Sequence, residues 1–166
     1  MIVSIRIDDR LIHGQVALVW SKELNTSRIV VANDEAARND VMKMTLKMAT
    51  PAGIKLLIKS LNDSISVFND PRSKDLKLFV LTNCVHDTLE IVKNCPDVQS
   101  VNVANVGRFD ESEASLKKQL NPYIILNPQE LMDLKELATY ELPVYAQVVP
   151  TNAKTPIQNL LDGMKE

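Results

Sequence analysis

The sequence predicts an α/β fold of one domain, in which a mainly parallel β-sheet is covered by helices on both faces. Short runs rich in β-branched residues alternate with amphipathic stretches along the whole chain, and this is the pattern of repeated βα units. Several of the runs are continuously apolar, as expected for strands that helices cover on both sides. A length of 166 residues suits one domain over residues 1–166, because a chain of this size can bury one core without dividing.

The expected elements follow from these patterns in order along the chain. Strands are expected at 2–7, 28–33, 54–58, 76–82, 98–103, 123–127 and 144–149. Helical spacing of apolar residues predicts helices at 15–24, 35–49, 61–68, 87–94, 129–138 and 156–164. Pro51 and Gly53 end the second of these helices, while Asn127 and Pro128 supply a cap and a first-turn proline for a later one. The stretch 107–119 is the longest without a clear pattern, and part of it is expected to be helical.

Apolar residues recur at helical spacing in two of these stretches, so that each set forms one stripe along its helix. We expect both stripes to face the core rather than a cofactor. The stripes consist of Val16, Trp20 and Leu24 in the first helix and of Val41, Met44 and Met48 in the second.

Composition excludes several classes of function. A net charge of −2 and an aromatic content of 4% offer neither a basic field nor stacking rings for nucleic acid. The apolar runs are too short to span a bilayer, and the N-terminal residues lack the features of a secretory signal, so the chain is expected in the cytoplasm. Cys84 and Cys95 match neither a disulfide framework nor a zinc spacing, and no metal is expected.

The sequence also argues against two classes of protein that act on phosphoryl groups, the nucleotide-binding enzymes and the receiver domains. The glycines Gly14, Gly53, Gly107 and Gly163 are scattered, so the sequence has neither a dinucleotide-binding motif nor a P-loop. A receiver domain would carry an aspartate at the end of the third strand, where this chain has the run 57–59, Leu-Ile-Lys.

Residues with ionisable or nucleophilic side chains gather where the first expected strand ends and the first helix begins, in the run 6–16, RIDDRLIHGQV. Ligands of open parallel sheets collect at this end of the strands. His13 lies three residues after Arg10, is preceded by the carboxylates Asp8 and Asp9, and is followed by Gly14.

These residue types suit phosphoryl transfer through a phosphohistidine. A neutral imidazole can attack phosphorus and form a covalent intermediate. Arg10 and the N–H groups of Gly14 and Gln15 at the helix start could stabilise the phosphoryl oxygens. Asp8 or Asp9 could bond the other ring nitrogen of His13 and fix its tautomer. No cofactor is then required.

Structural roles are the alternative for each of these residues. A histidine near a helix start is often a cap or a surface residue, and aspartates there often serve turns. Asn33, Asp34 and Asn102 stand at expected strand ends, where they either line the site or act as caps and turn residues. His86 has no basic neighbour in the sequence, which favours a cap or surface role. A module that binds a small anion at Arg10 and His13 without covalent chemistry is the main competing function, and phosphate labelling distinguishes it.

The run 6–16 resembles the active-site segment of the IIB proteins of the mannose, fructose and sorbose family of the sugar phosphotransferase system (PTS). The likeness continues through 33–37, 48–55 and 147–150 and covers nearly the whole chain. The resemblance implies that His13 accepts a phosphoryl group on Nδ1 from a phosphorylated IIA protein and passes it to a sugar that enters through the IIC and IID membrane subunits.

The resemblance also implies site roles and a place in the cell. His13, Arg10 and Asp9 are the expected catalytic residues of this protein-N(pi)-phosphohistidine–sugar phosphotransferase component, and the expected supporting or phosphate-binding residues are Asp8, Gly14, Gln15 and Arg6. We expect a cytoplasmic protein associated with the membrane permease, and a homodimer is left open. The sugar stays open among mannose, fructose, sorbose, glucosamine derivatives and N-acetylgalactosamine, because membrane subunits select it. His13 should be well exposed on a shallow surface, since it must meet two partners in turn.

The sequence departs from the family pattern at one place. Where the family commonly has an asparagine, a small apolar residue and two glycines, this chain has Asn102-Val103-Ala104-Asn105. This departure argues against a role for backbone donors of that segment at the site.

Overall fold

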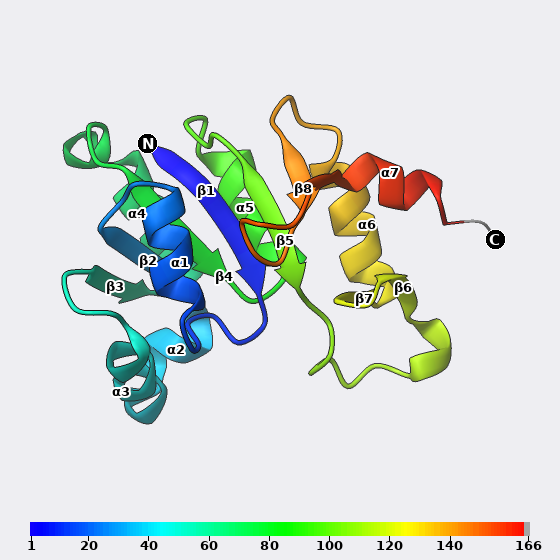
Figure 1. The fold of residues 1–166 in the computed structure, drawn as a ribbon, viewed down its shortest axis with the longest axis horizontal. Helices are drawn as coiled ribbons and strands as arrows, with labels where there is room; N and C mark the ends of the chain where they lie inside the picture. Colours follow the sequence, from blue (N-terminus) through cyan, green and yellow to red (C-terminus); the bar gives the residue numbers. More distant parts are fainter. Residues whose placement is uncertain (165–166) are drawn as a thin grey trace.

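A seven-stranded sheet forms the centre of the protein (Figure 1), and the computed structural model describes it within residues 1–164. The last two residues of the expected unit 1–166 lie outside this range. The strand order is β3-β2-β4-β1-β5-β8-β9, and within this sheet every described pair is parallel except β8 with β9. The strands are β1 (Ile2–Asp8), β2 (Arg28–Ala32), β3 (Lys55–Lys59), β4 (Leu78–Thr82), β5 (Val101–Asn105), β8 (Val144–Ala146) and β9 (Thr155–Pro156).

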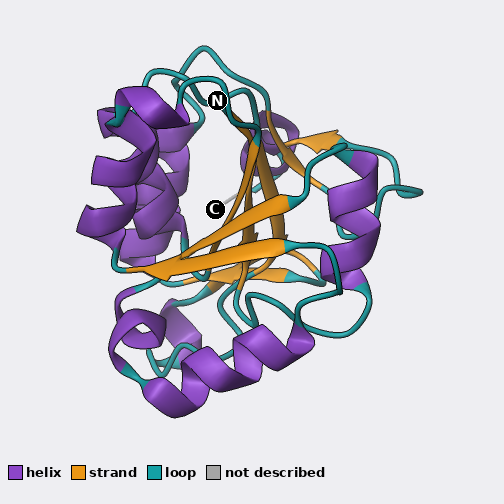
Figure 2. Ribbon diagram, turned by 90° about the vertical axis from the view of Figure 1, so that its left-hand side faces the viewer, coloured by secondary structure: helices purple, strands orange, loops and turns teal. Residues whose placement is uncertain are grey.

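Helices cover both faces of this sheet, as expected (Figure 2). The first three pack into one core and the other four into a second, larger core on the opposite face. The helices are α1 (Val16–Glu23), α2 (Asp34–Arg38), α3 (Asp40–Ala49), α4 (Leu61–Asn69), α5 (Val85–Asn94), α6 (Pro128–Leu137) and α7 (Ile157–Asp162), with 3₁₀ turns at Pro71–Ser73 and Ala114–Leu116. Most bounds differ from the expected ones by only a few residues. No helix of residues 1–164 is both long and apolar enough to cross a bilayer.

Strand alternation decides which side chains reach which core. Successive residues of a strand point to opposite faces. Ile5 and Ile7 of β1 belong to the larger core. Arg6 between them therefore points to the opposite face, where its guanidinium lies 5.2 Å from the centre of the Trp20 ring of α1.

The helix expected at 35–49 is wrong as one element, because it is divided into α2 and α3 at Asn39. The backbone of Asn39 is extended, with φ −110° and ψ 107°, and its side chain accepts a hydrogen bond from Met42 N. Asn33 caps α2 in the same way by accepting from Ala36 N. Asparagine competes well as an N-cap, so Asn39 starts a new helix where the apolar periodicity suggests continuity.

The two apolar stripes differ in burial. Trp20 is 3% exposed, and Val16 and Leu24 pack against the same core, so the expectation for α1 is confirmed. The expectation for α3 is wrong, because α3 contacts the core through Leu46 and Met42 instead. The residues of its predicted stripe are exposed: Val41 by 75%, Met44 by 64% and Met48 by 81%.

The strand expected at 123–127 exists but lies outside the central sheet. β7 (Ile124–Leu126) pairs antiparallel with β6 (Lys118–Asn121) to form a separate hairpin. The expected helical part of 107–119 is only the 3₁₀ turn at Ala114–Leu116.

Candidate functional site

The loop between β1 and α1 turns back on itself at the carboxyl end of the central strand. Leu11 and Gly14 have positive φ angles of 59° and 53°, and Leu11 N donates to Asp8 O at 2.9 Å. A left-handed backbone costs a non-glycine residue about 1 kcal/mol, and burial of the Leu11 and Ile12 side chains in the core under α1 offsets this cost. The turn brings His13 back to the end of the strand from which the loop started.

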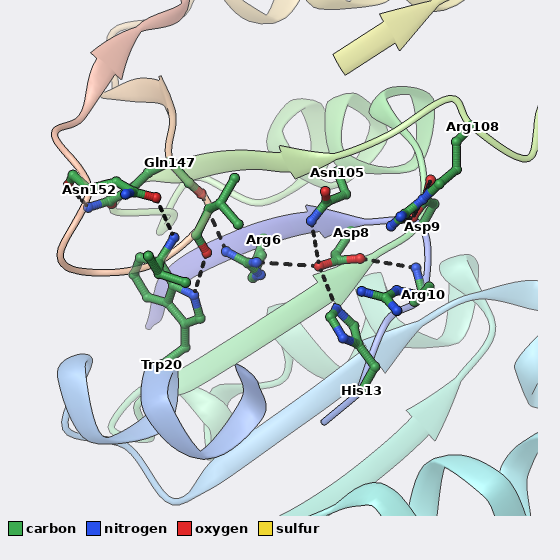
Figure 3. A network of polar contacts seen from close by, with 12 residues as sticks. Arg6, Asp8, Asp9, Arg10, His13, Trp20, Asn105, Arg108, Gln147 and Asn152 are labelled. Carbon is green, nitrogen blue, oxygen red and sulfur yellow. Dashed lines mark hydrogen bonds and ion pairs between the residues drawn. The ribbon is translucent and has the colours of Figure 1, made fainter. Parts of the chain in front are cut away.

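His13 meets Asp8 through one ring nitrogen only (Figure 3). The distance from His13 Nε2 to Asp8 Oδ2 is 3.1 Å, and the aspartate side chain is fully buried. A carboxylate can only accept, so a neutral His13 carries its proton on Nε2 and keeps the lone pair on Nδ1. The carboxylate thereby fixes the ring orientation and leaves Nδ1 available as a nucleophile.

Asp8 is held by three further donors. Arg6 Nη2 and Asn105 Nδ2 each donate to Oδ2 at 3.3 Å, and Arg10 N donates to Oδ1 at 3.1 Å. A buried carboxylate requires such partners, since its desolvation is otherwise costly. The carboxylate is therefore fixed in orientation from several sides.

Arg6 is the buried counter-ion of Asp8. Its side chain is 1% exposed, and burial lowers the pKa of the guanidinium while Asp8 opposes that change. Arg6 Nη1 also donates to Gln147 O at 3.5 Å, and Figure 3 shows Gln147 on the side of Arg6 away from Asp8. The structure thus places Arg6 as a buried counter-ion and not at the surface where a phosphoryl group would arrive.

Asp9 does not approach the imidazole. Its carboxylate pairs with Arg108, whose Nη2 lies 2.9 Å from Asp9 Oδ1, and this hydrogen bond raises the pKa of Arg108. Of the two aspartates before His13, Asp8 is the one that orients the ring.

Arg10, Gly14 and Gln15 lie at the exposed rim of the loop. Gln15 is the N-cap residue of α1, and Val16 N donates to His13 O at 3.3 Å. The main-chain N–H groups of Gly14 and Gln15 donate to no main-chain carbonyl of residues 1–164. These donors, together with the Arg10 side chain, are available to an anion beside His13.

The His13 side chain is only 20% exposed, which corrects the expectation of a well-exposed imidazole. The ring is turned inward because Nε2 is held by the buried carboxylate of Asp8. It nevertheless reaches solvent beside Gly14 and Gln15, which are exposed.

Sequence reasoning missed Asn105 and Arg108 as neighbours of the loop. Both lie at or after the end of β5, which pairs with β1, and a chain alone does not reveal which strands are neighbours. Asn33 and Asp34 act as caps instead, since Asn33 accepts from Ala36 N and Asp34 accepts from Leu61 N. Asn102 is buried within β5 and is not among the described partners of Asp8 or His13.

His86 lies at the surface at the start of α5. Its side chain is 54% exposed, and Nδ1 lies 3.3 Å from Asp133 Oδ2. Residues 1–164 contain no group of three or more His, Cys, Asp or Glu side chains placed to hold a metal ion.

The sequence and the fold match known proteins over nearly their whole length. The family model described as "PTS system sorbose subfamily IIB component" matches residues 2–166. A probable phosphotransferase enzyme IIB component of Streptococcus pyogenes serotype M6 is 54% identical over 98% of this chain and 100% of its own. The sorbose-specific EIIB component of Klebsiella pneumoniae is 34% identical over 97% of this chain and 93% of its own. The crystal structure of the IIBSor domain of the Klebsiella pneumoniae sorbose permease superposes with a TM-score of 0.89 at 31% identity, covering 99% of this chain and 98% of that one.

Proposed function

The chain belongs to the sorbose subfamily of PTS IIB components, and from this membership we propose that it is a phosphocarrier in which Nδ1 of His13 carries the phosphoryl group. The observation that supports this most directly is the contact of His13 Nε2 with the buried Asp8 carboxylate at 3.1 Å. In a neutral ring this contact favours the proton on Nε2, which supports Nδ1 as the nucleophile.

The proposed first step is uptake from a phosphorylated IIA protein. The Nδ1 lone pair of His13 forms a bond to phosphorus while the phosphorus–nitrogen bond of the donor phosphohistidine breaks, and the bonding pair leaves with the donor imidazole. Positive charge that develops on the His13 ring is stabilised by Asp8, which lies against the Nε2 proton. No separate base is needed, because the attacking Nδ1 carries no proton.

Charge on the transferring group is met at the rim of the loop. Arg10 supplies a planar fork of donors that matches phosphoryl oxygens. The N–H groups of Gly14 and Gln15 add donors at the start of α1, where the helix dipole also favours negative charge. Arg6 acts indirectly, by neutralising Asp8 from the interior, and Asp9 holds Arg108 at the edge of the site.

The proposed second step passes the group to a sugar at the membrane. The oxygen of a sugar hydroxyl forms a bond to phosphorus as the bond to Nδ1 breaks. The electron pair of that bond returns to Nδ1, and the hydroxyl proton is released to water. IIB components of this family act with a IIA protein and with IIC and IID membrane subunits, so we place this chain in the cytoplasm next to that permease. The partial exposure of His13 allows the two partners to reach Nδ1 in turn.

Labelling tests the proposal directly. The wild-type protein is incubated with a phosphorylated IIA protein, and the adduct is examined for stability in acid and alkali and located by mass spectrometry. We expect one acid-labile, alkali-stable phosphoryl group on His13, and ¹⁵N and ³¹P spectra should place it on Nδ1. Binding of the IIA protein without any adduct would refute the proposal and favour an anion-binding module.

A further inference from the structure

A β-bulge at the end of β5 places one further side chain against Asp8. In the pairing of β1 with β5, Ile7 lies opposite Val103, but Asp8 lies opposite Asn105. Ala104 is therefore the extra residue of β5. Bulges beside active sites commonly redirect a side chain, and here regular pairing would place Ala104 opposite Asp8.

Asn105 contacts the loop through its main chain and its side chain. Asn105 O accepts from Asp9 N at 2.8 Å, and Asn105 Nδ2 donates to Asp8 Oδ2 at 3.3 Å. The residue is 9% exposed, so its amide is directed inward and not toward a docking partner.

The contact is made to the oxygen that also accepts from His13. Figure 3 shows Asn105 and His13 on opposite sides of the Asp8 carboxylate, with Arg6 approaching from the strand. Arg6 and Asn105 both donate to Oδ2, but only Arg6 brings charge. An uncharged donor adds an orienting hydrogen bond without further neutralising Asp8.

We propose that Asn105 is a positioning residue for phosphoryl transfer, because its amide holds Asp8 in the orientation that keeps the His13 proton on Nε2. The proposal rests on the proposed function of His13. The Asn105 amide is directed at Asp8 from a position that is 9% exposed, so Asn105 acts through Asp8. Its effect should therefore appear in the rate of the chemical step and in the state of the ring, not in partner affinity.

The decisive variant is Asn105→Asp, which keeps the shape of the side chain but replaces the donor with an acceptor. We expect single-turnover phosphoryl uptake to fall about tenfold, which corresponds to about 1.4 kcal/mol, with an unchanged KM for phosphorylated IIA. The ¹⁵N shifts of the His13 ring should show the proton on Nε2 in the wild type and a mixture of tautomers in the variant. Asn105→Ala should lie between the two proteins in both measurements.

Asn83→Ala is the matched control. Asn83 follows β4, which pairs with β1 on the side opposite to β5, and it is not among the described partners of Asp8. It should leave both the rate and the ¹⁵N shifts as in the wild type.

The outcomes separate this proposal from the function on which it rests. An Asn105→Asp protein that transfers at the wild-type rate and keeps the Nε2 tautomer would overturn the role of Asn105, even if His13 is labelled normally. An unlabelled wild-type protein would refute the function, and the ¹⁵N shifts would still decide whether Asn105 positions the ring. If Asn105→Asp does not fold, Asn105→Gly, which tolerates the bulge backbone, is subjected to the same two measurements.

Discussion

Two histidine–aspartate pairs lie at the same edge of the sheet within residues 1–164, and the groups around the two rings differ. His13 contacts Asp8 through Nε2 at 3.1 Å, and His86 contacts Asp133 through Nδ1 at 3.3 Å. The nitrogen left free is thus Nδ1 in the first pair and Nε2 in the second. The side chain of His86 is 54% exposed and that of His13 is 20% exposed. Solvent exposure therefore does not explain why His13 rather than His86 is the proposed acceptor.

The difference lies in the donors that surround each ring. At the start of α5, the N–H groups of Val85 and His86 already donate to the Glu130 carboxylate at 2.8 and 3.0 Å. Burial is the main cause that raises the pKa of Glu130 and of Asp87, with nearby carboxylates adding to it. The helix start beside His86 is therefore filled by the protein's own anion.

At the start of α1 the corresponding donors are open. Gly14 and Gln15 have no described main-chain acceptor, Arg10 is exposed, and the charge of Asp8 is balanced by the buried Arg6. The comparison indicates that an aspartate prepares the tautomer of a histidine, while unoccupied donors around it decide whether a phosphoryl group can be held there.

The largest expected effect separates the two rings directly. His13→Ala should abolish phosphoryl incorporation from phosphorylated IIA, because His86, the other histidine of the sequence, contacts Asp133 and not the donors around His13. His86→Ala should be labelled like the wild type. Quantitative labelling measures both, and circular dichroism checks that each variant is folded. Continued labelling of a folded His13→Ala protein would refute the central assignment.

The next effect concerns the two aspartates. Asp8→Asn should slow single-turnover transfer about a hundredfold, because an amide no longer dictates the His13 tautomer, as in other carboxylate-oriented histidines. It should also destabilise the protein by about 3–5 kcal/mol, since Arg6 keeps a buried charge without its counter-ion.

Asp133→Asn is the control for that variant, and it should leave the transfer rate unchanged. Rapid-quench kinetics give the rates, and denaturant unfolding gives the free energies. Equal transfer rates for Asp8→Asn and the wild type would show that the His13–Asp8 contact has no part in the chemistry.

The sequence alone was sufficient for the parts of the site that are contiguous in the chain. Residues 6–16 contain His13, the proposed nucleophile, and Asp8, which contacts its ring. The end of a buried strand followed by a helix start predicts that both lie at the edge of the sheet where ligands of parallel α/β folds bind. The inward direction of Arg6 is also consistent with strand alternation, since Ile5 and Ile7 on either side face one core. Local period and position therefore predict local geometry.

Contacts between distant segments could not be predicted in this way. Asn105 reaches Asp8 because β5 pairs with β1 and carries a bulge, and neither feature has a signal within the residues themselves. The stripe of Val41, Met44 and Met48 shows the same limit, because periodicity identifies an apolar face of α3 but not what covers it. Asn39 caps a new helix there, and Leu46 takes the buried position instead.

The smallest expected effect tests whether the guanidinium of Arg10 is one of the donors that hold the phosphoryl group beside His13. Arg10→Lys keeps a positive charge beside His13, and it keeps the main-chain bond from residue 10 to Asp8 Oδ1, so His13 should stay oriented. It loses the planar fork that matches two phosphoryl oxygens at once. We therefore expect transfer to slow by about three- to tenfold, in line with the loss of one charge-assisted hydrogen bond, with little change in the affinity for phosphorylated IIA.

Arg108→Lys makes the same chemical change at the guanidinium that pairs with Asp9, outside the contacts of Asp8 and His13, and should transfer at the wild-type rate. Single-turnover kinetics measure the transfer rate of both variants. If Arg10→Lys and Arg108→Lys transfer equally fast, the planar fork of Arg10 does not hold the phosphoryl group. The main-chain donors of Gly14 and Gln15 are then sufficient to explain why His13 is phosphorylated and His86 is not.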